Sequence, residues 1–271
     1  MSNNKRFAFV GDVHGCYEEL MELVETIGFY EGKIDKLVFV GDLIDKGPEP
    51  KKVLEWLKTW EASCVFVKGN HEEKHIRYNM HEKRKLKNKS YVNPMEFSKD
   101  HLATREQILE IKNFDPFYWM DSWNDYYYCL DEGRHLVLHG GLLPGQKAED
   151  MPVKILTRVR YLTDNNEMAH LDEITSDMRF WTEEYSGPEK VIFGHQPFLA
   201  PHISKFAIGI DTGCVHGNKL TAYLSHDQSF VSVPAKKNYF PLIIKSPGKL
   251  SSVWSSFNTA SVSSHQEKED E

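Results

Sequence analysis

Residues 7–15 read Phe-Ala-Phe-Val-Gly-Asp-Val-His-Gly, an apolar run of four residues followed at once by metal-ligand side chains between glycines. The run is typical of a buried strand, and the glycine marks its end. The same arrangement returns at residues 37–45, where Leu-Val-Phe-Val precedes Gly-Asp-Leu-Ile-Asp, and at residues 64–72, where Cys-Val-Phe-Val-Lys precedes Gly-Asn-His-Glu. Each of the three predicted strands is therefore followed directly by side chains with carboxylate, imidazole or amide groups.

Two helical patterns separate these predicted strands. Apolar residues recur on one face of residues 17–27, and Val53, Leu54 and Leu57 form a similar stripe within residues 51–60. The order strand, helix, strand, helix, strand is typical of parallel βαβ units. In open α/β sheets the functional site lies outside the carboxyl ends of the strands. The Asp, His and Asn side chains fall at those ends.

Short predicted strands dominate the chain after residue 125, without long helices between them. We expect them to form a second, mixed sheet that faces the first, in a protein of the α/β class. Two further fragments in this half, His139-Gly140-Gly141 and Gly194-His195-Gln196, also join histidine to glycine. The expected strands are residues 126–130, 135–138, 191–193, 207–210, 220–224 and 230–233.

The segment between the third strand and this second half is polar and helical in pattern. Residues 74–89 carry seven Lys or Arg against one acid, Glu82. Such a run is either a solvated face or a contact for a polyanionic substrate. We interpret residues 74–114 as a basic helical insertion in a catalytic domain of residues 1–245, and the Ser-rich residues 246–271 as a disordered tail.

Composition bounds the class of protein. The chain has 271 residues, a net charge of -7 and 40% hydrophobic residues, which is ordinary for a globular protein and argues against a protein that coats DNA. Its four cysteines are scattered, as expected for reduced thiols in the cytoplasm. The N-terminal apolar run is too short for a signal peptide, and no apolar stretch approaches the roughly 20 residues of a membrane helix. We therefore expect a cytoplasmic protein without a membrane partner.

Six side chains from these fragments could bind two divalent metal ions that share one carboxylate. Asp12 and His14, two residues apart on an extended strand end, would point to the same side and bind one ion. Asp42 would bridge that ion to a second one about 3.5–4 Å away. The remaining ligands of the second ion would be Asn70, His139 and His195.

The donor types limit the choice of metal and indicate its use. Carboxylate, imidazole and amide oxygen suit Mn²⁺, which we expect, and also Fe, Zn, Co or Ni. A hydroxide held between two such ions would be nucleophilic at neutral pH. Any single Gly-Asp or Gly-His pair is usually only a turn. Five such fragments in this order favour a shared metal centre.

The motifs resemble those of the calcineurin-like metallophosphoesterases, in particular the branch that holds phosphoprotein phosphatases and symmetric diadenosine tetraphosphatases. The family pattern GDxHG, GDxxDRG, GNHE, HGG and GH is matched between residues 11 and 195. This resemblance implies a four-layer αββα sandwich with the site at its rim. It also implies that His71 is the general acid, or a positioning cation, and that Asp45 hydrogen-bonds its imidazole and keeps it protonated.

Three cations are candidates for binding the phosphate groups of a substrate. Lys46 stands where the family usually has arginine, and lysine lacks the planar fork that grips phosphate with two hydrogen bonds. Residues 156–161, Leu-Thr-Arg-Val-Arg-Tyr, resemble a segment of diadenosine tetraphosphatases. Arg158 or Arg160 of this segment could reach the phosphates, or both could belong to an exposed basic edge.

Three functions fit these observations. The first is a phosphohydrolase that cleaves phosphoanhydride bonds of nucleotides such as diadenosine tetraphosphate. The second is a protein Ser/Thr phosphatase with the same site, acting on a phosphoprotein. The basic run would also suit an RNA 5′ end. The third is an inactive scaffold that only binds partners, which the intact ligand set disfavours.

Overall fold

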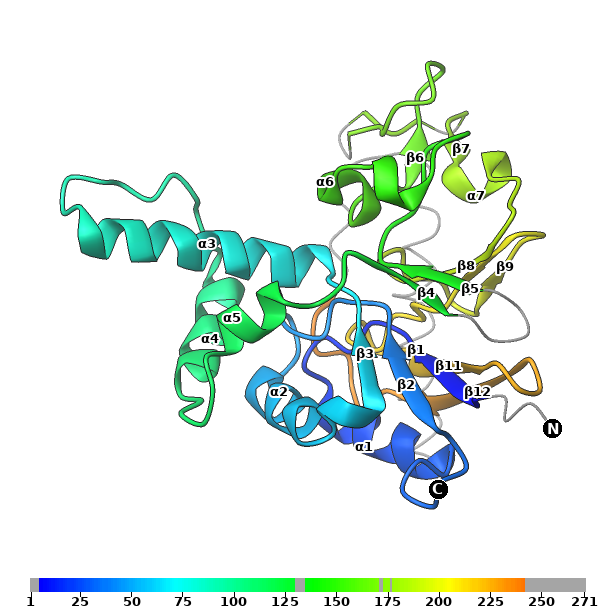
Figure 1. The fold of residues 1–271 in the computed structure, drawn as a ribbon, viewed down its shortest axis with the longest axis horizontal. Helices are drawn as coiled ribbons and strands as arrows, with labels where there is room; N and C mark the ends of the chain where they lie inside the picture. The colour runs from blue at the N-terminus through cyan, green and yellow to red at the C-terminus, as the bar shows by residue number, and fades with distance from the viewer. Residues whose placement is uncertain (1–4, 130–134, 171–172, 176, 242–271) are drawn as a thin grey trace, which may run out of the picture.

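The computed structural model describes residues 5–129, 135–170, 173–175 and 177–241. Within these residues two five-stranded sheets lie face to face, with helices on their outer faces (Figure 1). The four-layer α/β architecture expected from the sequence is therefore confirmed. The predicted tail, residues 246–271, lies outside the described residues.

Seven elements build the first sheet and the helical layer outside it: β1 (Phe7–Val10), α1 (Tyr17–Thr26), β2 (Lys36–Phe39), α2 (Pro50–Thr59), β3 (Cys64–Phe66), β11 (Lys219–Leu224) and β12 (Ser229–Pro234). The strand order is β12-β11-β1-β2-β3. β1, β2 and β3 are parallel, as the alternation of strands and helices predicted. Their carboxyl ends therefore meet at one edge of the sheet.

The expectation that all later strands form the second sheet is wrong for the last two. β11 pairs antiparallel with β1, in a register that places Ala222 opposite Val10, and β12 pairs with β11. The backbone N–H of Gly11 extends this pairing by donating to the Thr221 carbonyl at 3.0 Å. The parallel sheet thus gains an antiparallel edge from the far end of the chain.

The second sheet has the order β4-β5-β8-β10-β9 and is mixed. β5, β8 and β10 are parallel, while β4 and β9 pair antiparallel at the edges. Short helices and a two-stranded ribbon, β6-β7, lie outside it (Figure 1). The elements are β4 (Tyr126–Cys129), β5 (His135–Leu138), α6 (Val153–Leu156), β6 (Tyr161–Leu162), β7 (Arg179–Phe180), α7 (Trp181–Glu184), β8 (Lys190–Phe193), β9 (His202–Ile203) and β10 (Ala207–Gly209). Two 3-10 turns cover Glu61–Ser63 and Ala148–Asp150.

The buried apolar side chains form three clusters, and alternate residues of one strand belong to different clusters. In β1, Phe7 and Phe9 point between the two sheets, whereas Ala8 and Val10 face the side of α1 and α2. Successive side chains of a strand point to opposite faces, so a fully apolar strand can bury both. This explains why these strands read as continuous apolar runs instead of alternating ones.

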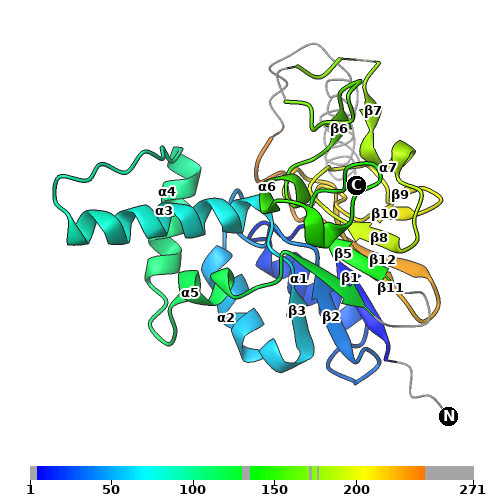
Figure 2. The same ribbon diagram turned by 45° about the horizontal axis from the view of Figure 1, so that its top comes forward.

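A helical arm leaves the body directly after β3. α3 (Asn70–Lys87) projects away from the sheets in both views (Figures 1 and 2), and α5 (Pro116–Asp121) packs against it. α4 (Lys99–Leu109) packs against α2 and reaches α3 through Arg105, which donates to Asn79 at 3.0 Å. The predicted helical pattern of this region is thus confirmed, although residues 88–98 contain no helix. Among the helices that the structure describes, none has the length and hydropathy needed to span a membrane.

Candidate metal centre

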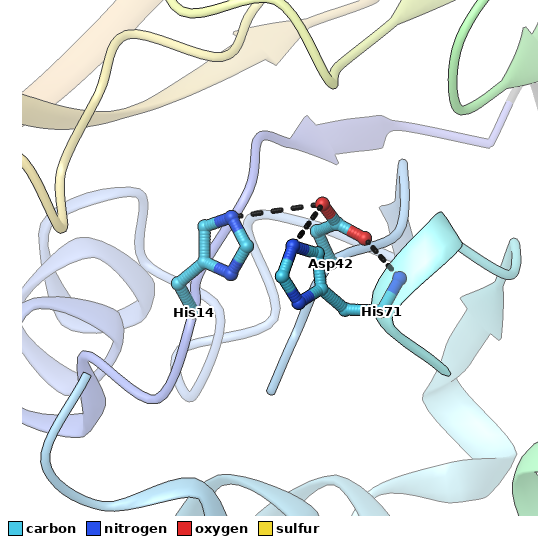
Figure 3. A group of neighbouring side chains, drawn as sticks. All are labelled: His14, Asp42 and His71. Atoms are coloured by element: carbon cyan, nitrogen blue, oxygen red, sulfur yellow. Dashed lines mark hydrogen bonds and ion pairs between the residues drawn. The ribbon is translucent and has the colours of Figure 1, made fainter. Parts of the chain in front are cut away.

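Loops at the carboxyl ends of several strands bring histidines around one carboxylate, that of Asp42. Its Oδ2 atom lies 3.6 Å from Nε2 of His14, 3.8 Å from Nε2 of His71 and 3.3 Å from Nε2 of His139. Figure 3 shows the first two contacts, together with the hydrogen bond that the backbone N–H of His71 donates to Asp42 Oδ1. One oxygen therefore faces imidazoles from two loops and from the first turn of α3.

Asp42 belongs to two groups of potential metal ligands. It lies with His14 and His71 in one group and with His139 and His195 in the other, and the donor atoms within each group are less than 4.8 Å apart. A carboxylate that bridges two cations requires this position between two sets of ligands. The bridging role predicted for Asp42 is thus geometrically available.

Asn70 and Asp12 complete the predicted set. The Asn70 Oδ1 atom lies 3.2 Å from Nε2 of His139, and the Asp12 carboxylate accepts the backbone N–H of His195 at 3.1 Å. The structure thus gathers all six predicted ligands. The reason given for pairing Asp12 with His14 is wrong, however, because the segment is not extended. His14 has a φ of 47°, and its N–H donates to the Asp42 carbonyl.

Backbone carbonyls orient two of the imidazoles toward the centre. Nδ1 of His14 donates to the Ile44 carbonyl at 2.9 Å, and Nδ1 of His139 donates to the Val40 carbonyl at 2.9 Å. This leaves the Nε2 lone pair of each ring facing the Asp42 carboxylate. Nε2 of His14 accepts a hydrogen bond from Lys46 Nζ at 2.8 Å, whereas the lone pair of neutral His139 faces the oxygens of Asp42 and Asn70 with no donor between them, and such lone pairs repel. A cation placed among them removes that repulsion, so the donor set fits divalent metal ions.

The charges of the site also favour bound cations, because the carboxylates of Asp12, Asp42 and Asp211 are buried close together. Burial, then the charges of Asp211 and Asp42, raise the pKa of Asp12 well above its usual range. Burial also raises the pKa of Asp211 to about 6. Burial alone would raise the pKa of Asp42 too, but the charges of His139 and His71 hold it well below its usual range. Bound cations would stabilise all three ionised forms.

Unusual backbone conformations concentrate at the same place. In the described chain seven non-glycine residues have a positive φ, and five of them are His14, Asp42, Asp45, Lys46 and His195. Each costs on the order of 1–3 kcal/mol, and such residues gather at functional sites where surrounding contacts hold them. The neighbouring glycines allow close approach. A Cβ on Gly69 would lie 2.1 Å from Asp42 Oδ1, and one on Gly194 would lie 2.1 Å from Asp12 Oδ1.

Glu72 holds the Asp42 loop in shape. Its carboxylate is fully buried and accepts four backbone N–H groups, from Asp42, Leu43, Ile44 and Gly69, at 2.8 to 3.3 Å. Sequence reasoning gave this glutamate no role. Its signal was its place at the third position of α3, where a glutamate caps the start of a helix.

Asp45 supports the predicted general acid, His71. It accepts a hydrogen bond from Nδ1 of His71 at 2.7 Å, so the predicted contact is confirmed. Its other oxygen lies 2.8 Å from Nε2 of His75, and His101 of α4 lies 3.7 Å from the carboxylate. Burial would raise the pKa of Asp45, but the hydrogen bonds from His71 and His75 hold it well below its usual range. Neither His75 nor His101 was predicted.

The three candidate phosphate-binding cations lie close to the ligands. Lys46 Nζ is 2.8 Å from Nε2 of His14. Arg160 Nη2 donates to the backbone carbonyl of His195 at 3.1 Å, and burial lowers the pKa of its guanidinium to about 10. Arg158 pairs with Glu73 of α3. The two arginines and the ligands Asn70 and His195 line one cavity of about 420 Å³.

Comparisons with known proteins agree with this geometry. A tetraphosphatase of Halalkalibacterium halodurans, named bis(5'-nucleosyl)-tetraphosphatase PrpE [asymmetrical], is 31% identical over 244 residues, which cover 86% of this chain and 95% of the relative. The protein of the same name from a Geobacillus species is 31% identical over 241 residues, covering 86% and 95%. A solved structure named as a candidate diadenosine tetraphosphatase superposes with a TM-score of 0.67 at 25% identity, covering 86% of this chain and 95% of that one.

The family profile of the calcineurin-like phosphoesterases matches residues 5–233, which include all six gathered ligands. Enzymes of this family use a dinuclear site for divalent metal ions. The match extends over both sheets and the loops between them. The chain therefore belongs to the calcineurin-like phosphoesterase family and is a metal-dependent phosphohydrolase.

Proposed function

We propose that this protein hydrolyses the phosphoanhydride chain of bis(5′-nucleosyl) tetraphosphates at the centre built around Asp42. The observation that carries the proposal is the position of Asp42 Oδ2 between two groups of histidines, one of them next to Lys46 and the other next to Arg160. Ligands for metal and cations for phosphate thus adjoin one another. The names of the relatives point to the same class of substrate.

The proposed ligands are Asp12, His14, Asp42, Asn70, His139 and His195. Two divalent cations held there, with Mn²⁺ as the expected species, would activate water and stabilise charge on the phosphoryl group. Lys46 and Arg160 would bind phosphate oxygens, Lys46 as a point charge and Arg160 through its planar fork. Arg158 would extend this cationic surface into the adjoining cavity.

His71 is the proposed proton donor to the leaving oxygen. Its Nδ1 is engaged by Asp45, which leaves Nε2 facing the centre, 3.8 Å from Asp42 Oδ2. A positioned histidine of this kind contributes roughly 10²- to 10⁴-fold to a hydrolysis rate. The hydrogen bond from Nδ1 to Asp45 would hold the ring in this orientation.

The names of the relatives specify asymmetrical hydrolysis, and we use them to infer which bond of the phosphate chain is cleaved. The sequence motifs also resemble those of symmetric enzymes. We infer that water attacks off the centre of the phosphate chain. Diadenosine tetraphosphate would then yield one nucleoside monophosphate and one triphosphate. Two diphosphates would instead show symmetric cleavage.

The test compares substrates on the purified, Mn²⁺-loaded protein. We expect turnover of diadenosine tetraphosphate with a kcat/KM at least tenfold above that for a phosphoserine peptide, and chromatography of the products gives the cleavage position. A higher value for the phosphopeptide would identify a protein phosphatase instead. A cytoplasmic location completes the proposal and rests on the four buried cysteines, which are thiols and form no disulfide. Recovery of the protein outside the cytoplasmic fraction of cells would contradict it.

A further inference from the structure

The cavity beside the metal centre extends the site in one direction. Asn70 and His195 border it on the side of the centre, and the described residues of the remaining wall come from the α6–β6 segment, from residues 168–170 and from Ile174. We propose that this cavity is the subsite for the nucleoside and outer phosphates that lie beyond the scissile bond. The inference rests on the proposed function and adds a location for the second half of the substrate.

Charge in the cavity suits phosphates. Lys154, Arg158 and Arg160 all line it. Arg158 is held in place by Glu73 of α3 and by the Thr157 hydroxyl, to which its Nη1 donates at 2.8 Å. Nε of Arg160 is buried and has no hydrogen-bond partner among the described residues. A buried donor left unpaired costs free energy, and a phosphate oxygen of the substrate could accept its hydrogen bond.

Part of the wall is apolar, as a nucleobase requires. Met168, Ala169 and Ile174 form this part, and the exposed His170 also lines the cavity. The Ala169 backbone donates to the Tyr161 carbonyl at 2.9 Å, which fixes this wall to β6. A thioether such as that of Met168 makes favourable contacts with an aromatic ring. A lining that combines cations with apolar side chains suits a nucleotide, which carries phosphates at one end and a base at the other.

Size supports a nucleotide over a bare phosphate group. The cavity volume of about 420 Å³ falls within the roughly 300–1,000 Å³ typical of small-molecule sites. A simple phosphate monoester would contact only the metal centre and leave this volume unused. The subsite should therefore matter for diadenosine tetraphosphate and not for p-nitrophenyl phosphate, which gives a direct test.

The experiment uses Lys154→Ala and Met168→Ala, two residues with no place in the proposed catalytic machinery. Matched controls are Lys147→Ala, at an exposed lysine that lines a separate cavity of about 440 Å³, and Met80→Ala, at an exposed methionine on α3. Steady-state kinetics of the Mn²⁺-loaded, full-length proteins are measured with diadenosine tetraphosphate and with p-nitrophenyl phosphate. Circular dichroism and melting temperature verify that each variant folds.

We expect the KM for diadenosine tetraphosphate to rise about fivefold in Lys154→Ala and about threefold in Met168→Ala, with kcat within about twofold of wild type. Hydrolysis of p-nitrophenyl phosphate should stay unchanged in all four variants. The subsite is wrong if the two cavity variants behave like the controls, or if they lower the hydrolysis of both substrates equally.

A separate outcome would reject only the proposed function. If the wild type hydrolyses p-nitrophenyl phosphate but leaves diadenosine tetraphosphate intact, the tetraphosphatase assignment fails. The dinucleotide is then tested as an inhibitor of p-nitrophenyl phosphate hydrolysis. An inhibition constant that rises about fivefold in Lys154→Ala would still support the subsite. An unchanged constant, or no inhibition of the wild type, would overturn it.

Discussion

The carboxylate of Asp45 holds the imidazole of His71 through a 2.7 Å hydrogen bond to Nδ1, so Nε2 of that ring is directed toward Asp42. The same carboxylate lies 2.8 Å from Nε2 of His75, which is four residues further along α3 and therefore on the same face of the helix. Both oxygens of Asp45 are thus engaged by one helix. The predicted proton donor is fixed through a residue that does not itself reach the centre.

Substituting Asp45→Asn should lower kcat and leave metal binding intact. An amide has one acceptor oxygen, so it can accept from only one of the two imidazoles and places an NH₂ group against the other. Loss of such a support typically costs about 10- to 100-fold in activity. We expect that fall in kcat with p-nitrophenyl phosphate, at an unchanged metal content measured by elemental analysis. Asp227→Asn, in an exposed turn, is the control, and an unchanged kcat in Asp45→Asn would show that His71 does not depend on this carboxylate.

Glu72→Gln should destabilise the fold. Oε2 of Glu72 accepts the N–H groups of Asp42 and Gly69, while Oε1 accepts those of Leu43 and Ile44. Either orientation of a glutamine would press its NH₂ group against two of these donors. The free energy of unfolding should fall by about 2–4 kcal/mol, because buried donors lose their acceptor.

Urea unfolding at pH 8 measures this loss. At that pH the carboxyl is ionised, since burial and the charge of Asp42 raise its pKa only to about 7. Glu106→Gln, on the exposed surface of α4, is the matched control and should change the free energy by less than about 0.5 kcal/mol. Equal stability of both variants would show that the four hydrogen bonds contribute little.

Most of the first sheet and the ligand set could be predicted because short, continuous stretches of sequence specify both. Each of β1, β2 and β3 is an apolar run that ends within one to three residues of a glycine, and a ligand follows that glycine directly. Parallel strands then bring their carboxyl ends to one edge without further information. The predicted strand limits differ from the observed ones by about one residue for this reason.

The remaining features depend on contacts between distant segments, which no local pattern encodes. β11 reads like the strands before it, and only its pairing with β1 assigns it to the first sheet. His101 reaches Asp45 because α4 folds back against α3, after a helix-free stretch of residues 88–98. Arg158 meets Glu73 across 85 positions of sequence. Such placements are set by tertiary packing.

Lys46 stands where the family motif has arginine, and substitutions at this position test what the difference does. Its Nζ lies 2.8 Å from Nε2 of His14, close enough to contact a phosphate at the centre. Arginine would add a planar fork that forms two hydrogen bonds with phosphate. We expect Lys46→Arg to lower the KM for diadenosine tetraphosphate about threefold, and Lys46→Ala to raise it about tenfold. If the KM of the alanine variant equals that of wild type, Lys46 does not bind substrate.

His216 should make the fold sensitive to acid. Its ring is buried and Nδ1 donates to the Phe240 carbonyl at 2.6 Å. Burial, with the charge of Lys46, lowers the pKa of this histidine to about 3, whereas in the unfolded chain it is about 6.5. The unfolded chain therefore binds a proton first as the pH falls. The stabilisation is present above about pH 6.5 and is lost progressively toward pH 3, by roughly 2 kcal/mol at pH 5.

The variant His216→Asn keeps a donor near the position of Nδ1 but does not titrate. Its free energy of unfolding should fall about 2 kcal/mol less between pH 7 and pH 5 than that of wild type, whatever its stability at pH 7. Denaturant unfolding at the two pH values gives this difference. The exposed His226→Asn serves as control, and an equal pH slope in His216→Asn and wild type would contradict the assignment.

Asp42→Asn should separate the bridging role from simple packing. An asparagine has nearly the same shape, but its neutral amide cannot join two cations. We expect about two metal ions per wild-type chain in elemental analysis, and one or fewer in the variant. A ligand present at 100 times its dissociation constant stabilises a protein by about 2.7 kcal/mol, so Mn²⁺ should raise the melting temperature of the wild type after chelation. In Asp42→Asn that increase should largely disappear, together with hydrolysis of p-nitrophenyl phosphate. A variant that still binds two ions and gains the same thermal stabilisation would show that the pair of cations does not depend on this carboxylate, and the centre would then have to be built around another residue.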